Sequence, residues 1–177
     1  MKKIICLLSL TSFFCVSLRA QTATADSLIH KAFASLKNNE EQSFVALFPT
    51  YPQIRRIFDG MVAGIKDTAM RAKMKMQLDK VDEAAYNKDL KPEFGNAFRS
   101  FQEQAKAKGM NWLTARLDSF PAHEEESPGM DIKYLNGKMY VSSGNAAYVI
   151  PFSNVVYADG GWYGIQLNGI ESAGKKD

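Results

Sequence analysis

The feature that most constrains this sequence is a change in the spacing of its apolar residues near Met110. Residues 26–109 carry apolar side chains three and four positions apart, which is the spacing of one helical face. Residues 110–170 carry short apolar runs separated by turn residues, a pattern typical of strands. Helices followed by strands predict an α+β fold, with N-terminal helices packed on one face of a C-terminal antiparallel, curved sheet.

Five helices are expected in the first block. The clearest begins at Pro52, because the apolar residues after it all fall on one helical face. Segment 70–86 is ambiguous, since its first nine residues alternate apolar and polar side chains like a strand. These nine are good helix formers without a β-branched residue, so a helix is predicted. The other helices are predicted to begin at Asp26, to cover 44–48 and to run over 92–109.

The second block is expected to fold as a series of antiparallel strands. Its predicted segments, in chain order, are a strand at 111–120, a polar loop at 121–129, a hairpin over 131–141, a turn at 142–145, a strand at 146–158, a last strand at 161–167 and a frayed tail at 171–177. Asn136-Gly137 is the sequence signal for the two-residue hairpin turn. Pro151 indicates that the long strand is an edge strand or contains a bulge.

The first twenty residues have the composition of a secretory signal peptide. Two lysines precede an apolar run too short to span a bilayer as a helix, and small residues follow it. Cleavage is expected after Ala20 or after Ala25. Residues 21–177 would then form a single secreted or periplasmic α+β domain, with no membrane anchor after cleavage because no lipid-attachment motif surrounds a cysteine.

Removal of the leader changes the cysteine content and the charge of the chain. Cys6 and Cys15 both lie in the leader, so the mature domain is expected to contain no disulfide. Lys2, Lys3 and Arg19 lie there too, so 19 of the 22 basic residues remain against 19 acidic ones. A chain without net charge lacks the basic surface that nucleic acids require, and no nucleic-acid partner is expected.

Two stretches resemble the nuclear-transport-factor-2-like superfamily, which has the cone-shaped fold of ketosteroid isomerase. They are KAFASLKNNEEQSFVALFP at 31–49, similar to the two short helices that open that fold, and GWYGIQL at 161–167, similar to its last strands. The resemblance implies helices packed on a curved sheet. Residues 51–110 depart from it, because they are predicted to be helical where that fold places one helix and an early strand. No catalytic residue carries over, and the superfamily includes enzymes, binding proteins and scaffolds.

The alternation of side chains in the last strand predicts two apolar faces. Tyr163, Ile165 and Leu167 are expected to pack under the helices. Trp162 and Gln166 are then expected to point to the opposite, open face of the sheet.

The same alternation predicts a ligand-binding site on the open face, formed by Trp112, Arg116, Asp118, Trp162 and Gln166. Aromatic rings beside a guanidinium, a carboxylate and an amide are typical of pockets that orient a small amphipathic ligand. The same residue types are typical of protein interfaces, including that of a homodimer. An ordinary core layer is the third interpretation of the two tryptophans.

The expected function is therefore binding of a small amphipathic molecule or of a protein partner by a non-catalytic exported domain. The alternative is an isomerase-like or lyase-like enzyme, in which Asp118 acts as general base and a tyrosine or Arg116 polarises the substrate. No cofactor is expected. His123 and the glutamates after it resemble a solvated acidic loop more than a cation site, so no metal is expected either.

Overall fold

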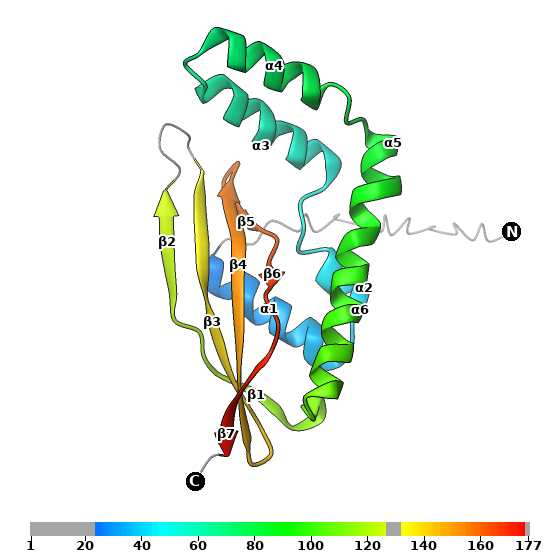
Figure 1. The fold of residues 1–177 in the computed structure, drawn as a ribbon, viewed down its shortest axis with the longest axis vertical. Coiled ribbons are helices and arrows are strands. Elements are labelled where there is room, and N and C mark those ends of the chain that lie inside the picture. Colours follow the sequence, from blue (N-terminus) through cyan, green and yellow to red (C-terminus); the bar gives the residue numbers. More distant parts are fainter. Residues whose placement is uncertain (1–23, 127–131, 176–177) are drawn as a thin grey trace, which may run out of the picture.

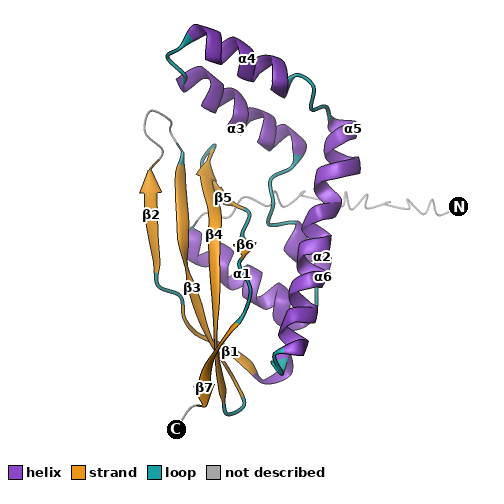
Figure 2. Cartoon of the chain, in the orientation of Figure 1, coloured by secondary structure: helices purple, strands orange, loops and turns teal. Residues whose placement is uncertain are grey.

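The computed structural model of the chain describes residues 24–126 and 132–175. The predicted leader at 1–20 lies outside these residues. The helices are α1 (Ala25–Asn38), α2 (Glu41–Val45), α3 (Tyr51–Gly64), α4 (Thr68–Leu78), α5 (Glu83–Ala85), a π-helical turn η1 (Tyr86–Leu90), α6 (Lys91–Ala107) and a 3-10 turn η2 (Trp112–Thr114). The strands are β1 (Ala115–Ser119), β2 (Ala122–Glu126), β3 (Lys133–Ser143), β4 (Ala146–Ala158), β5 (Gly161–Tyr163), β6 (Gln166–Leu167) and β7 (Glu171–Lys175). Helices followed by a curved antiparallel sheet confirm the predicted α+β class (Figure 1, Figure 2).

The predicted helices are confirmed, with differences at their ends. Helix α1 begins two residues earlier than expected, because Thr24 and not Asp26 is its cap, accepting a hydrogen bond from the Ser27 amide at 3.2 Å. The ambiguous segment is helical as α4, but this helix ends at Leu78 and not near Tyr86. A separate helix begins after Asp82, whose carboxylate accepts a hydrogen bond from the Ala85 amide at 2.7 Å.

The seven strand segments of the described residues occupy four neighbouring positions in the sheet. β1 and β2 both pair with one side of β3, which pairs with β4. β5, β6 and β7 all pair with the other side of β4. All of these pairs are antiparallel, so that the sheet is a meander with β3 and β4 at its centre.

Helices α1, α2 and α6 lie on one face of the sheet and enclose the main hydrophobic core (Figure 1). Leu36, Phe44 and Phe98, one from each helix, are at most 2% exposed. They belong to the same cluster as Met139 of β3 and Ile150 of β4, which are 0% exposed. Burial of these apolar surfaces is the main stabilising contribution to such a core.

Helices α3 and α4 form a separate hairpin at one end of the sheet (Figure 1). Arg55 of α3 connects the two helices, because its guanidinium donates to the Leu78 carbonyl at 2.7 Å and to Asp79 at 3.2 Å. None of the residues of α4 is buried. Because α4 buries no residue, it is mainly α3 that packs this hairpin against the sheet.

A bulge at Asn154 sets which side chains of β4 face the helices. Leu135 pairs with Val155 and Gly137 with Phe152, so one residue of β3 lies opposite two of β4. Asn154 adopts φ 56°, a left-handed conformation that asparagine tolerates. Because the bulge shifts the alternation by one residue, Phe152 and Val155 both face the core. Of the two alternatives that Pro151 indicated, the strand contains a bulge, and it is not an edge strand because it pairs on both sides.

The predicted hairpin turn at Asn136-Gly137 is wrong, because both residues lie inside the continuous strand β3. Gly137 is needed there for close packing and not for a turn. A Cβ at this position would lie 2.5 Å from the Pro121 carbonyl oxygen and 2.7 Å from the Phe152 ring. The hairpin into β4 instead turns at 144–145, within the turn that was predicted at 142–145.

Two segments predicted to lack regular structure are strands. Residues 122–126 of the predicted polar loop form β2, which pairs with β3 along its whole length, while 127–131 lie outside the described residues. Charged side chains are typical of such an edge strand, because they oppose pairing with other chains. Residues 171–175 of the predicted frayed tail form β7 on the edge of β4.

Candidate functional site

Trp162, predicted to lie on the open face, is part of the main core. It is 7% exposed, and its ring lies 5.2 Å from that of Tyr157, its partner in the β4–β5 register. The prediction failed because GWYGIQL is not one strand. Gly164 has φ 67°, which ends β5 and shifts the alternation. Trp162 and Ile165 therefore both belong to the core beneath the helices.

Trp112 also lies on the helix-covered side and not on the open face. It belongs to η2, and its ring contacts Phe33 of α1 at 6.1 Å and Phe101 of α6 at 6.4 Å. The 3-10 turn explains the error, because the alternation of a strand does not apply to it. The indole Nε1 is buried and has no hydrogen-bond partner among the described residues.

Arg116 and Asp118 are exposed on the open face, as predicted. Arg116 pairs with Ser142 in the β1–β3 register, and the Ser142 hydroxyl donates to Asp118 Oδ1 at 3.0 Å. These two predicted site residues are the only ones of the five that the structure brings together. Neither lines the apolar pocket or the groove described below.

Gln166 is exposed on the same face but lies far from Arg116. It pairs with Ser153 of β4, whereas the row of Arg116 reaches β4 at Ala147. Six residues along a strand correspond to about 20 Å. The Gln166 side chain accepts a hydrogen bond from Asn154 Nδ2 at 2.7 Å. The five predicted residues therefore do not form one site.

The acidic segment at His123 makes local polar contacts. His123 Nε2 lies 3.0 Å from Glu125 Oε1, and Lys133 Nζ lies 3.8 Å from Glu124 and 3.4 Å from Glu126. Within 24–126 and 132–175, no group of three or more metal-ligating side chains is close enough to hold an ion.

The structure instead contains an apolar pocket of about 330 Å³ between α3 and the ends of β3, β4 and β5. Four side chains of α3 form one wall, at the spacing i, i+3, i+4 and i+7 that places them on one helical face. They are Ile54, Ile57, Phe58 and Met61. The sequence predicted the apolar face of this helix but gave no signal for the pocket opposite it.

The sheet supplies the second wall of this apolar pocket. Tyr134, Val156 and Tyr163 form a row across β3, β4 and β5, since Val156 is paired with both tyrosines. This row lies on the face opposite Trp162, because neighbouring residues of a strand point to opposite faces. Ile132 and Ile165 also line the pocket, and Ile165 is where the pocket borders the main core, to which it belongs as well.

A hydrogen-bonded unit fixes the Tyr163 hydroxyl at the wall of the pocket. Gln53 Oε1 accepts hydrogen bonds from the amide and the hydroxyl of Thr50, both at 2.8 Å. These donors fix the orientation of the Gln53 amide, so that its Nε2 is the atom 3.3 Å from the Tyr163 hydroxyl oxygen. Tyr163 is thus the acceptor in this bond. Its own O–H proton has no acceptor among the described residues.

The electrostatic surroundings keep this hydroxyl protonated. Burial raises the pKa of Tyr163, and the negative charge of Asp159 raises it further. Asp159 Oδ2 accepts a 2.6 Å hydrogen bond from Arg56 Nε, which gives α3 a second connection to the β4–β5 turn. None of the residues that line the pocket is an acid, a base or a histidine. The pocket is therefore an uncharged cavity whose polar side chains are Tyr163, Tyr134 and the pair Asn154–Gln166, which are hydrogen-bonded to each other at 2.7 Å.

Comparisons with known proteins gave no identification: no family model, no curated protein and no solved structure matches this chain. The relationship to the nuclear-transport-factor-2-like superfamily remains a proposal that rests on the two stretches of sequence. In the described part of the chain, the longest apolar helical segments are too short or too polar to cross a bilayer.

Proposed function

We propose that the protein binds a small, mainly apolar molecule with one neutral hydrogen-bond acceptor, in the pocket between α3 and the sheet. The observation that carries the proposal is the Tyr163 hydroxyl, whose proton is not used by the protein at the wall of an apolar cavity. A volume of about 330 Å³ is at the lower end of the range typical of small-molecule sites.

The chemistry of the lining favours a neutral ligand. A carboxylate or an ammonium group would lose its hydration without gaining a partner of opposite charge, which is strongly unfavourable. Arg56, the nearby cation, is already paired with Asp159. A carbonyl or ester oxygen, by contrast, accepts a hydrogen bond from Tyr163 without carrying charge into the pocket.

The lining also supports binding more than catalysis. It contains no carboxylate, imidazole, amine or thiol that could transfer a proton or attack a substrate at neutral pH. The alternative general base, Asp118, lies on β1 and accepts a hydrogen bond from Ser142. A protein interface on the open face has less support, because the two tryptophans expected to form it, Trp112 and Trp162, lie on the helix-covered side of the sheet.

A fluorescence experiment tests the site. N-phenylnaphthylamine, a neutral dye that fluoresces in apolar surroundings, should bind the wild-type protein and be displaced by methyl decanoate. Ile57→Trp fills the pocket and should weaken dye binding by about tenfold or more, ~1.4 kcal/mol. Ala63→Trp is the matched control, since Ala63 is exposed on α3 and does not line the pocket. Equal binding by both variants would contradict the proposal.

A second variant tests the hydrogen bond. Tyr163→Phe keeps the ring and removes the O–H donor, so the affinity for methyl decanoate should fall by about threefold to tenfold, since a net hydrogen bond contributes ~0.5–1.5 kcal/mol. The affinity for the dye, which has no carbonyl, should stay unchanged. A parallel loss for both molecules would show that Tyr163 only shapes the pocket.

We further propose that the protein acts after export, on the basis of the leader-like composition of residues 1–20. Mass spectrometry of the protein from its native host should then find Gln21 or Asp26 at the N-terminus and no acyl chain. An intact Met1, or a lipid on Cys15, would overturn this proposal.

A further inference from the structure

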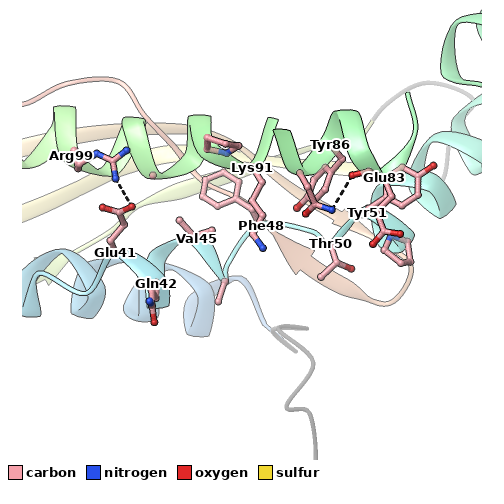
Figure 3. Close-up of a pocket in the computed structure, with 15 residues that line it drawn as sticks. Glu41, Gln42, Val45, Phe48, Thr50, Tyr51, Glu83, Tyr86, Lys91 and Arg99 are labelled. Atoms are coloured by element: carbon pink, nitrogen blue, oxygen red, sulfur yellow. Dashed lines mark hydrogen bonds and ion pairs between the residues drawn. The ribbon is translucent and has the colours of Figure 1, made fainter. Parts of the chain in front are cut away.

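A second cavity lies on the other side of the segment that connects α2 with α3. This groove, of about 990 Å³, runs between the 41–52 segment and the helix formed by α5, η1 and α6 (Figure 3). It differs from the apolar pocket under α3 because charged side chains line it: Glu41, Glu83, Lys91 and Arg99.

The floor of the groove is aromatic. Phe48 lies along it (Figure 3) and stacks on Phe94 of α6 with ring centroids 4.0 Å apart and an angle of 11° between the rings. Tyr51 and Tyr86 flank one end, 6.0 Å apart. Their hydroxyls already donate to backbone carbonyls, at 3.2 and 2.9 Å. These tyrosines therefore offer ring surface to a ligand and no free O–H donor.

The π-helical turn places a cation above this floor. In η1 the Lys91 amide donates to the Tyr86 carbonyl, an i to i+5 bond that brings residues five apart onto one side of the helix. Lys91 therefore lines the groove together with Tyr86 (Figure 3). Its ammonium group forms no ion pair or hydrogen bond with the described residues.

The other charges of the groove do not compete for an anion at Lys91. Arg99 is paired with Glu41 at one end of the groove (Figure 3) and also donates to Asn96 Oδ1 at 2.7 Å. Glu83 is at the other end and precedes Lys91 by eight residues, about 12 Å along a helix. This separation exceeds the Debye length of about 8 Å at physiological salt, so that repulsion from Glu83 is weak.

From this geometry we infer that the groove is a second ligand site, which takes a small aromatic anion: its ring lies on Phe48 and the tyrosine rings, and its negative group pairs with Lys91. Stacking on aromatic rings and a charge-assisted hydrogen bond are the two interactions that such a ligand needs. The groove and the apolar pocket under α3 have only Phe48 in common among their lining residues, and the lining of that pocket favours a neutral molecule.

Two dyes with the same rings and different charge test this inference. Anilinonaphthalene sulfonate is an anion, and N-phenylnaphthylamine is its neutral counterpart. Lys91→Gln should weaken binding of the anion by about fivefold, the upper range for a partly exposed ion pair, and leave the neutral dye unchanged. Lys88→Gln is the matched control, because this lysine is exposed on η1 and does not line the groove.

The same measurements in Ile57→Trp separate the two sites, because this substitution fills only the apolar pocket. In the Ile57→Trp protein, Lys91→Gln should still weaken binding of the anionic dye. Added salt should make this loss of affinity smaller, because salt screens the ion pair. Unchanged anion affinity in Lys91→Gln would overturn the inference, as would an equal loss in Lys88→Gln or for the neutral dye. Weaker binding of the neutral dye by Ile57→Trp tests only the apolar pocket of the proposed function, and it does not bear on the groove.

Discussion

Gln53 Nε2 donates a hydrogen bond to the Tyr163 hydroxyl over 3.3 Å, and this bond joins α3 to β5 across 110 residues of sequence. Tyr163 is 1% exposed and Gln53 7% exposed. The neighbouring Trp162 is buried as well, on the other face of the strand. Adjacent residues of one short strand thus hold two different parts of the protein to the sheet: α3 through Tyr163, and the main core through Trp162.

This arrangement predicts that Trp162→Ala and Tyr163→Ala are both strongly destabilising. Removing a buried aromatic side chain typically costs about 3–5 kcal/mol, a large part of the usual stability of a domain. Urea unfolding followed by circular dichroism measures both values. A Trp162→Ala protein as stable as the wild type would show that the indole is not in the core.

The close packing around Gly137 predicts opposite effects for two glycine-to-alanine substitutions. In Gly137→Ala the new methyl group would meet backbone atoms of Pro121 and Ala122, which cannot move aside, and stability should fall by about 1–3 kcal/mol. Gly60→Ala, in the interior of α3 with nothing within 4 Å, should stabilise the protein by about 0.5–1 kcal/mol. Thermal unfolding of the two variants compares them directly. A loss of stability in both would contradict this packing.

The buried tyrosines predict a loss of stability in alkali. Burial raises the pKa of both Tyr86 and Tyr163, so that the folded state holds their protons more tightly than the unfolded chain does. Their contribution is complete below the unfolded pKa of about 10 and is lost as pH rises through the raised value. The free energy of unfolding should fall above about pH 10, and less steeply in Tyr163→Phe. A slope that is equal in both proteins would contradict the raised pKa of Tyr163.

The position of α4 predicts that it unfolds separately from the sheet. Lys73→Pro removes a hydrogen bond in the middle of this helix and introduces a ring clash, which costs about 3 kcal/mol or more. Because α4 has no buried residue, local unfolding of 68–78 relieves that cost. Hydrogen exchange should show fast exchange of these amides in the variant while β3 and β4 stay protected. Loss of protection in the sheet as well would show that α4 supports the whole fold.

Helices α1, α3 and α6 were predictable because each of them buries a single apolar face. Helix α3 was expected from Pro52 and observed from Tyr51, and α6 was expected over 92–109 and observed over 91–107. Local spacing carries this information, and no tertiary contact is needed to interpret it. The end of α4 was missed because three separate helical segments follow one another without a proline or glycine at the breaks.

The strands were less predictable because single residues shift their alternation. Asn154 and Gly164 adopt positive φ and move the following side chains to the other face. Their types permit this conformation without requiring it. Asn136-Gly137 was wrongly predicted to form a turn, because a glycine also occurs where close packing leaves no room for a Cβ, as it does at Gly137.

The candidate pocket could not be found from sequence, since its two walls meet only through tertiary packing. Ile57 and Met61 come from α3, whereas Tyr134, Val156 and Tyr163 come from three strands much later in the chain. The sequence identified each as apolar or aromatic. It could not show that Gln53, fixed by Thr50, would donate to the Tyr163 hydroxyl oxygen and leave the hydroxyl proton without an acceptor among the described residues.

The most direct test of the proposed function is a methyl NMR spectrum of the isoleucine-labelled protein during titration with methyl decanoate. Ile57, Ile132 and Ile165 line the apolar pocket, and Ile29 and Ile150 are buried in the main core away from it. The first three signals should shift with the ester, the last two should not, and the charged decanoate should bind more weakly. Pocket signals that do not respond to the ester, or that respond equally to decanoate, would contradict a neutral ligand at Tyr163.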